Sequence, residues 1–385
     1  MSRSTRPRSR HGATAAVLLL MAWGFAPPAI AERAAGPRTA IDLGALPGGQ
    51  SSAADLNDNG VVVGRSTTAG STGVHAVRWS RSARITDLGQ VDGLDTYALG
   101  VNRRGTAFGV AEHCSDPPID YCSLRWSPDG VLSRLPALSP GAESYPEAMN
   151  DSDVVVGYAG GAPDGRRHPV RWTASGQVVR LPEPPGAVNG VATGISNQGL
   201  VVGWAEFPGV GVRALLWDRD GNVIELPLAP DQSLSAALGV TEDGLVVGMV
   251  NRAGYHAARW QYRDHGVRHP VVLDADSYLY GMSRSGIAVA PGLRWDRSGR
   301  VTELDRLHDI GSALPAAVND AGIVVGVSGP ADGTATPVWW DREGTPHELP
   351  DHTRSPAVFV RAVNEAGAMV GQARFPGGQH AALWR

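Results

Sequence analysis

Leu56-Asn57-Asp58-Asn59-Gly60-Val61-Val62-Val63-Gly64 is the first full copy of a phrase that recurs through the chain. The phrase consists of an aliphatic residue, then Asn, Ser or Thr, then a polar stretch with Gly, a β-branched run and a closing Gly or Ala. Gly and Asn accept the positive φ of a hairpin turn, and Val-rich runs favour extended backbone. Each copy therefore predicts a tight turn followed by a strand. Further copies begin 36 to 48 residues apart, at Val101, Met149, Ile195, Val240, Met282, Val318 and Val363.

Two other phrases follow each copy and complete a repeating unit of about 45 residues. One ends in Trp, as in His75 to Trp79, and the other resembles Ile85 to Gly89. Short β-rich runs bounded by Gly, Asn and Asp predict strands joined by turns. The unit is therefore expected to be a four-stranded antiparallel meander, with strand a through Leu56-Asn57, strand b from Val61 to Gly64, strand c ending at Trp79 and strand d from Ile85. The unit Trp residues are Trp79, Trp126, Trp172, Trp217, Trp260, Trp295, Trp340 and Trp384.

A single unit of this kind cannot bury both of its faces. Radial stacking buries both faces and leaves only short edges, so we predict an all-β fold, a β-propeller of about eight four-stranded antiparallel blades. A linear β-solenoid is the alternative, but its coils are usually shorter and parallel. The regular Trp residues are expected to pack between blades.

The two ends of the chain suggest how the ring closes. The repeats begin with a lone fourth strand at Ile41 to Gly44 and end on a third strand at Trp384. We therefore predict that the N-terminal strand pairs with the C-terminal blade and closes the ring. The sixth unit is short between Gly281 and Trp295 and has Ala290 in place of the second Gly, so a ring of seven blades remains an alternative.

The N-terminus has the features of an exported protein. Basic residues up to His11 precede an apolar run from Ala13 to Phe25, and small residues end at Ala31. This pattern predicts a signal peptide at 1–31 with cleavage after Ala31, a short linker at 32–40 and one propeller domain at 41–385. The apolar run is too short to span a bilayer, so an uncleaved anchor is the weaker alternative. We expect a secreted protein without membrane insertion.

The charge of the chain argues against nucleic acid as a partner. The net charge is −4, and the first 31 residues carry four Arg and no acid. The remainder therefore has 30 basic and 38 acidic residues. A mildly acidic protein without basic runs is a poor candidate for binding nucleic acid.

The three phrases resemble the HAF-repeat family of probable extracellular proteins. The resemblance rests on Asp87-Leu88-Gly89, on Asn57 to Gly64 and on His75-Ala76-Val77-Arg78-Trp79, and it covers residues 41–385. The Phe of the family motif is replaced in this chain. The resemblance implies export and a repeated fold, and it brings no catalytic residues.

The long connections from strand d to the next strand a are the expected place for a binding function. They lead into the innermost strands and should ring the mouth of the central channel, where Tyr and carboxylate groups suit sugars or peptides. The candidate ligand-binding residues are Asp95, Tyr97, Glu143, Tyr145, Asp276, Tyr278, His308 and Asp309, with Trp204 at the start of a long loop between strands b and c. Ordinary solvated loop residues are the simpler interpretation of any one of them.

Other chemistry has weaker support in the sequence. His75, His168, His256 and His380 start the third strand in separate blades, too far apart to share a metal ion. Asn57-Asp58-Asn59-Gly60 lacks the length of a calcium loop and is expected to be a hairpin turn. We expect no metal and no cofactor, and no catalytic residue can be named. A carboxylate pair drawn from Asp95, Glu143 and Asp276 would suit a glycosidase, but the sequence cannot supply their separation.

Cys114 and Cys122 are the two cysteines of the chain. They flank one connection between strands b and c at nearly opposite offsets, so we predict a disulfide that stiffens this loop, with two free thiols as the alternative.

These observations favour a monomeric, non-catalytic extracellular binding module whose partner is an unknown glycan, peptide or protein. The alternatives are a polysaccharide lyase or glycosidase at the channel mouth and a purely structural surface protein.

Overall fold

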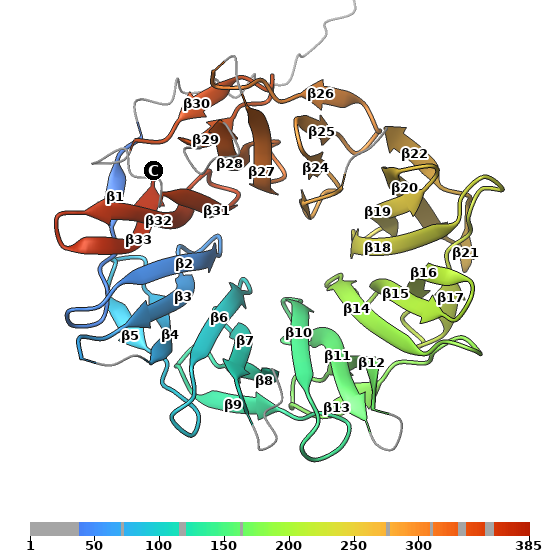
Figure 1. Ribbon diagram of the computed structural model, residues 1–385, viewed down its shortest axis with the longest axis horizontal. Helices are drawn as coiled ribbons and strands as arrows, with labels where there is room; N and C mark the ends of the chain where they lie inside the picture. Colours follow the sequence, from blue (N-terminus) through green and yellow to red (C-terminus); the bar gives the residue numbers. More distant parts are fainter. Residues whose placement is uncertain are drawn as a thin grey trace, which may run out of the picture. The chain divides into compact units, whose positions relative to one another are not determined.

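The computed structural model describes residues 38–70, 73–114, 121–161, 165–274, 278–308, 311–329, 336–350 and 358–385. These residues form eight antiparallel sheets and no helix, which confirms the predicted propeller of eight blades. The predicted signal peptide and residues 32–37 lie outside the described residues. Figure 1 shows the eight sheets arranged radially, with their first strands nearest the centre.

The strands of each blade follow the chain from the centre outward. Blade 1 contains β2 (Ser51–Leu56), β3 (Val62–Thr67), β4 (Val74–Trp79) and β5 (Ile85–Asp87); blade 2 contains β6 (Thr96–Val101), β7 (Ala107–Glu112), β8 (Tyr121–Trp126) and β9 (Leu132–Leu135). Blade 3 contains β10 (Ser144–Met149), β11 (Val155–Gly161), β12 (Arg166–Trp172) and β13 (Val178–Arg180); blade 4 contains β14 (Asn189–Ile195), β15 (Val201–Phe207), β16 (Gly211–Trp217) and β17 (Val223–Glu225). Blade 5 contains β18 (Leu234–Val240), β19 (Leu245–Asn251), β20 (Tyr255–Arg263) and β22 (Val271–Asp274), with the short β21 (Gly266–Val267) beside β20. Blade 6 contains β23 (Gly281–Met282), β24 (Ala288–Ala290), β25 (Leu293–Trp295) and β26 (Val301–Glu303); blade 7 contains β27 (Ser312–Val318), β28 (Val324–Gly329), β29 (Thr336–Trp340) and β30 (Pro346–Glu348). Blade 8 contains β31 (Phe359–Val363), β32 (Met369–Phe375), β33 (Gly378–Trp384) and β1 (Ala40–Asp42).

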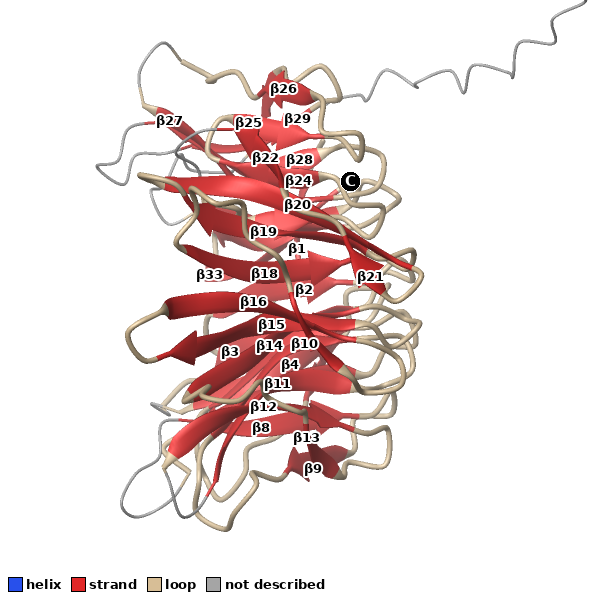
Figure 2. Cartoon of the chain, turned by 90° about the vertical axis from the view of Figure 1, so that its right-hand side faces the viewer, coloured by secondary structure: helices blue, strands red, loops and turns tan. Residues whose placement is uncertain are grey.

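The strand order gives the disc two different faces, which Figure 2 shows edge-on. The tight turns from the first to the second strand and from the third to the fourth lie on one face, here called the turn face. The connections from the second to the third strand, and from one blade to the next, lie on the other face, here called the loop face.

Where the repeated phrase carries Asn, its side chain ties its blade to the next on the turn face. Asn57 Oδ1 accepts the backbone N–H groups of Asn59 and Val61 within its own turn, each at 3.0 Å. Its Nδ2 donates to the carbonyl oxygen of Asn102 in blade 2 at 2.8 Å. The same donation continues from Asn102 to Asn150 and from Asn364 back to Asn57. One side chain therefore closes a turn and joins two blades, and the predicted hairpin turn is found at Asn57 to Gly60.

The two glycines of the phrase have different physical roles. Gly60 adopts a φ of +78°, which the turn requires and most side chains avoid. Gly64 lies under the bulged first strand, where a Cβ would collide with the Ser52 carbonyl oxygen. Ala290 occupies the equivalent position in blade 6, and there the first strand β23 pairs only with Ala288 and Val289. The sixth unit is thus a shortened blade, and the alternative of seven blades is wrong.

The Trp that recurs in each unit packs between blades, as predicted. Trp79 is fully buried in a core cluster with Leu56 and Val77 of blade 1 and Val370 and Leu383 of blade 8. The indole nitrogens of six units also donate across the blade boundary; Trp126 Nε1, for example, lies 3.0 Å from the Leu88 carbonyl oxygen. Burial of a large side chain and a satisfied N–H together make this position an inter-blade anchor.

The N-terminal strand closes the ring. β1 pairs with β33 in the register Ala40 to Trp384 and Asp42 to Ala382, so the last blade is completed by the first residues of the propeller. Leu43, which follows this strand, is 3% exposed in the core between blades 8 and 1. Closure therefore buries apolar surface as well as pairing backbone.

Candidate functional site

A chain of aromatic and charged side chains crosses blades 1 to 3 on the loop face. It begins with the Arg65 guanidinium, which lies over the Tyr97 ring at 5.6 Å from its centroid. The Tyr97 hydroxyl donates to Glu112 Oε2 at 3.2 Å. Burial, with the nearby Glu112 carboxylate, raises the pKa of Tyr97 to about 12. The Tyr97 phenol therefore stays protonated, and it is a hydrogen-bond donor at any physiological pH.

The next part of the chain joins blade 2 to blade 3. Tyr121 meets Tyr145 edge to face at 5.2 Å between ring centroids, and Tyr145 stacks on Tyr158 at 5.9 Å. The Arg167 guanidinium covers the Tyr158 ring at 4.7 Å and pairs with Glu143 at 2.7 Å. Burial is also the main cause that raises the pKa of Tyr158 to about 12.

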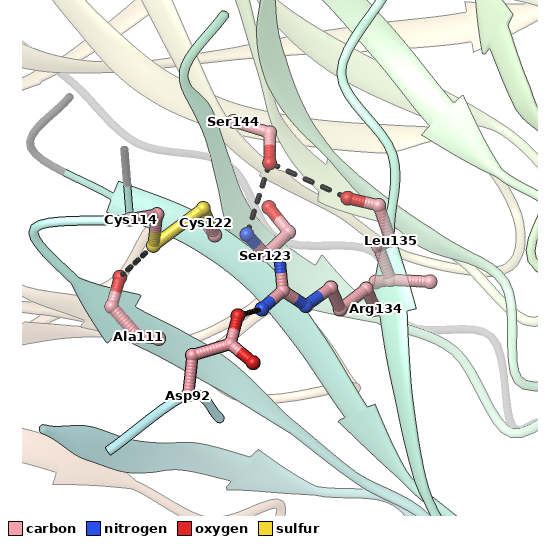
Figure 3. The surroundings of a disulfide bond; sticks show 8 residues. All are labelled: Asp92, Ala111, Cys114, Cys122, Ser123, Arg134, Leu135 and Ser144. Carbon is pink, nitrogen blue, oxygen red and sulfur yellow. Dashed lines mark hydrogen bonds and ion pairs between the residues drawn. A yellow bond between two sulfur atoms is a disulfide. The ribbon is translucent and has the colours of Figure 1, made fainter. Parts of the chain in front are cut away.

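The backbone beside these rings explains why they meet. The Ser144 hydroxyl oxygen accepts the Ser123 N–H at 2.9 Å, and the hydroxyl donates to the Leu135 carbonyl oxygen at 3.4 Å (Figure 3). Ser123 and Tyr121 share strand β8, and Tyr145 follows Ser144 in β10. The buried Ser144 therefore fixes the two strands together and sets the distance between the tyrosine rings.

The predicted disulfide lies at the same place and is confirmed. Cys114 and Cys122 are bonded, with 6.0 Å between their Cα atoms. Figure 3 shows the bond beside Ser123 at the end of the hairpin. Because Cys122 is the neighbour of Tyr121, the disulfide restrains the strand end that carries an aromatic ring.

The contacts continue into blade 4. The Arg167 N–H donates to Asn189 Oδ1 at 3.3 Å, and Asn189 Nδ2 donates to Glu206 Oε2 at 3.0 Å. We call the whole set the tyrosine arc; it consists of Arg65, Tyr97, Glu112, Tyr121, Glu143, Tyr145, Tyr158, Arg167, Asn189 and Glu206. Trp204 is partly buried in β15, two residues from Glu206, at the blade 4 end of the arc.

The arc includes three of the nine residues predicted from sequence, namely Tyr97, Glu143 and Tyr145. Tyr97 and Tyr145 are each the second residue of an innermost strand, not loop residues. Asp95 lies beside the arc, where its Oδ1 accepts the Val74 N–H at 2.7 Å and so links blades 1 and 2.

The other predicted residues are not gathered with these. Tyr278 is 50% exposed at blade 6 and contacts Tyr255 at 4.8 Å between ring centroids. His308 is exposed in the connection from blade 6 to blade 7. Asp276 and Asp309 lie outside the described residues.

Sequence reasoning missed Arg65, Tyr121, Tyr158 and Arg167, because they lie on second and third strands. A usable signal exists at the residue after the second Gly of the phrase. Gly64-Arg65, Gly157-Tyr158 and Gly203-Trp204 carry large side chains there, opposite residues of the innermost strand. Comparison of the eight copies at this position would have placed Tyr158 opposite Tyr145, whereas Arg65 lies opposite Ser52 and meets Tyr97 only across the blade boundary.

Three cavities that described residues line, of about 430, 330 and 260 Å³, lie on the turn face. The smallest is axial, and its lining includes Asp55, Asp151 and Glu242. Asp55 accepts the N–H groups of Leu56 and Val101, and burial raises its pKa to about 6. Asp151 and Glu242 likewise accept backbone N–H groups of the preceding blade's turn. These carboxylates have a structural role in joining blades.

Three of the repeated histidines pair with acidic side chains on or just after the fourth strand of the same blade. His75 Nδ1 lies 2.9 Å from Asp87 and His380 Nδ1 lies 3.0 Å from Asp42, so the His of one phrase pairs with the Asp of another. His168 pairs with Glu183 in the same way. Within the described ranges, no three His, Cys, Asp or Glu side chains form a group that could hold a metal ion. The same part of the chain has no helix long and apolar enough to cross a membrane.

The fold, but not the sequence, has clear relatives. No protein-family model matches the chain, and no curated protein matches its sequence. A solved structure of prolyl endopeptidases is 12% identical, with 84% of this chain and 54% of that chain covered and a TM-score of 0.55. Porphyromonas gingivalis dipeptidyl peptidase 4 is 10% identical, with coverage of 88% and 59% and a TM-score of 0.53. A streptogramin B lyase structure is 13% identical, with coverage of 90% and 97% and a TM-score of 0.45. The chain spans little more than half the length of the two peptidases, and at these identities the likeness shows the fold alone.

Proposed function

We propose that this protein is a secreted, non-catalytic binding module that recognises an extracellular ligand with the tyrosine arc of its loop face. The observation that carries the proposal is two runs of side-chain contacts, from Arg65 to Tyr97 in blades 1 and 2 and from Tyr121 through Tyr145 to Arg167 in blades 2 and 3, which adjoin where Glu112 pairs with Tyr121 in neighbouring strands. Half-buried tyrosines combine an apolar face with a hydroxyl and are enriched at recognition surfaces. The resemblance to HAF repeats and the N-terminal sequence pattern support export.

Catalysis has less support than binding. Asp95 accepts a backbone N–H, and Glu143 is paired with Arg167, so both carboxylates already have structural partners. Incubation of the protein with polysaccharides, followed by measurement of reducing ends and of absorbance from unsaturated products, tests this directly. Turnover that depends on Glu143 would contradict the non-catalytic binding module and support the alternative of a lyase or glycosidase.

Array binding tests the proposed surface. The secreted protein is applied to glycan and peptide arrays as wild type, as Tyr145→Ala and as Tyr262→Ala, the last being a tyrosine of the turn-face cavity. We expect Tyr145→Ala to lose binding and Tyr262→Ala to keep it. Loss of binding with Tyr262→Ala alone would assign recognition to the opposite face.

Export is tested separately. Expression of the full chain with a C-terminal tag, followed by fractionation and N-terminal sequencing, should give an extracytoplasmic protein that begins at Glu32. An intact N-terminus in the cytosol would contradict the proposal.

A further inference from the structure

We infer that the ligand of the tyrosine arc is an extended, uncharged oligosaccharide that lies across blades 1 to 4. This inference rests on the proposed function and adds the chemical class of the ligand. Three properties of the arc lead to it: its length, its charge pairing and its position within the sheets.

The length of the arc calls for an extended ligand. Its contacts cross three blade boundaries, from Arg65 to Tyr97, from Tyr121 to Tyr145 and from Arg167 to Asn189. Residues in four consecutive blades follow the circumference of the disc, so a compact molecule would reach only one or two of them. The three cavities described above lie on the other face and are not part of this path.

The charge pairing of the arc favours a neutral ligand. Glu143 is paired with Arg167, Glu112 accepts the Tyr97 hydroxyl, and Glu206 accepts the Asn189 amide. Arg65 and Arg167 against Glu112, Glu143 and Glu206 leave the arc with one net negative charge, too little to attract a polyanion or a polycation strongly. A carboxylate has about four lone-pair sites, so it can accept a sugar hydroxyl while keeping its present partner. The partly exposed Tyr121 and Tyr145 offer apolar ring surface to the C–H face of a sugar ring, and the Tyr97 hydroxyl, which donates its proton to Glu112, can still accept a sugar hydroxyl.

The position of the arc disfavours a peptide backbone as ligand. Extended peptides gain affinity by adding a strand to an exposed sheet edge. Tyr158 lies on β11, which pairs with β10 and β12, and Tyr121 lies on β8, which pairs with β7 and β9. Both edges of these strands are occupied. Tyr97 and Tyr145 lie on the innermost strands β6 and β10, which are paired on one edge only. A peptide strand added to that edge would run along one blade, whereas the arc crosses from blade to blade.

The test uses affinity electrophoresis and calorimetry with dextran, laminarin and xyloglucan as neutral glycans, alginate as an acidic glycan and a mixed peptide library. The folded wild-type protein should bind at least one neutral glycan, with affinity that changes less than about twofold between low salt and 1 M NaCl, because uncharged ligands are not screened. Tyr145→Ala and Tyr97→Ala should each weaken binding by about tenfold or more, since one aromatic stacking contact is of that order. Tyr262→Ala is the matched control and should bind as wild type does.

Two further variants keep the test decisive if Tyr145→Ala folds poorly. Tyr145→Phe retains the ring and its packing, and it should lose only the part of affinity that the hydroxyl supplies. Glu143→Gln replaces a carboxylate of the arc by an amide, which has one acceptor oxygen fewer, and it should weaken the binding of a neutral glycan. Equal binding by wild type, Tyr145→Phe, Glu143→Gln and Tyr97→Ala would show that the arc does not contact the ligand.

The outcomes separate the ligand class from the proposed function. Binding of alginate or peptides but not neutral glycans, with loss in Tyr145→Ala, would overturn the neutral oligosaccharide and leave the arc as a binding surface. Neutral-glycan binding that is unaffected by all arc variants would overturn both. Failure of the folded wild-type protein to bind any glycan or peptide would also overturn both.

Discussion

Substitution of Asn57 measures how much the ring of turn-face side chains contributes to stability. Asn57 is 3% exposed, and its side chain makes three hydrogen bonds, two to its own turn and one to Asn102 of the next blade. A net hydrogen bond contributes about 1 kcal/mol, so Asn57→Ala should lower the free energy of unfolding by about 3 kcal/mol. The assay is urea unfolding followed by tryptophan fluorescence, with the shift in midpoint compared at constant slope.

The repeat supplies the control for this prediction. Ser196 occupies the same position in blade 4, and its hydroxyl still accepts the Leu200 N–H at 3.2 Å, so the turn bond survives without an amide donor. Asn57→Ser should therefore keep the turn and lose mainly the inter-blade bond, at a cost of about 1 kcal/mol. In the reverse direction, Ser196→Asn should add a bond toward blade 5 and stabilise the protein by a similar amount. Equal destabilisation by Asn57→Ala and Asn57→Ser, or a loss below about 1 kcal/mol for Asn57→Ala, would refute the two-part role of this side chain.

Three other predictions concern closure, the disulfide and pH. Deletion of residues 38–44 removes β1 and the buried Leu43, so the melting temperature should fall. The free edge of β33 should also cause association of the protein, which size-exclusion chromatography detects. A monomer of unchanged melting temperature would contradict closure of the ring by β1. Replacement of both Cys114 and Cys122 by Ala opens a loop of sequence separation 8 and should lower the free energy of unfolding by about 2–3 kcal/mol in oxidising buffer. In reducing buffer the same replacement should change nothing, and urea unfolding measures both. An equal effect in the two buffers would mean that the bond is not formed. Burial raises the pKa of Asp55 to about 6, so its contribution to stability is greatest near pH 4 and falls as the pH rises through about 6. Asp55→Asn should therefore gain stability relative to wild type over that range, and parallel pH profiles of the two proteins would show that Asp55 does not titrate in this way.

The repeated phrases made most of the fold predictable, because their signals are local. A Gly with positive φ at position 60 and a β-branched run after it specify a turn and a strand within a few residues. Eight copies of a unit with two apolar faces then leave a closed ring as the arrangement that buries all of them. The lone strand at Ile41 and the final Trp384 showed how the ring closes, since an unpaired fourth strand and an unpaired third strand complete each other. The disulfide was predictable for the same reason, as both cysteines flank a single hairpin.

The candidate site was less predictable, because its contacts join residues of different blades. Tyr121 and Tyr145 belong to the third strand of one blade and the first strand of the next, and their separation depends on how Ser144 docks on Ser123. Loop residues such as Asp95 looked like ligand-binding groups, but Asp95 turned out to hold a backbone N–H of the neighbouring blade. Polarity in a loop does not reveal whether a side chain faces solvent or a strand.

Local chemistry in the sequence thus established the number of units, the turns, the inter-blade Trp and the closing strand. The tyrosine arc depends on the angle between neighbouring blades and on the register of their bulged first strands, neither of which is encoded in one unit. Tyr145 meets Tyr158 within one hairpin, but Arg65 reaches Tyr97, and Tyr145 reaches Tyr121, only after the blades are stacked around the axis. Contacts between side chains on separate sheets are long-range, so they arise from packing and not from any pattern that a single repeat displays.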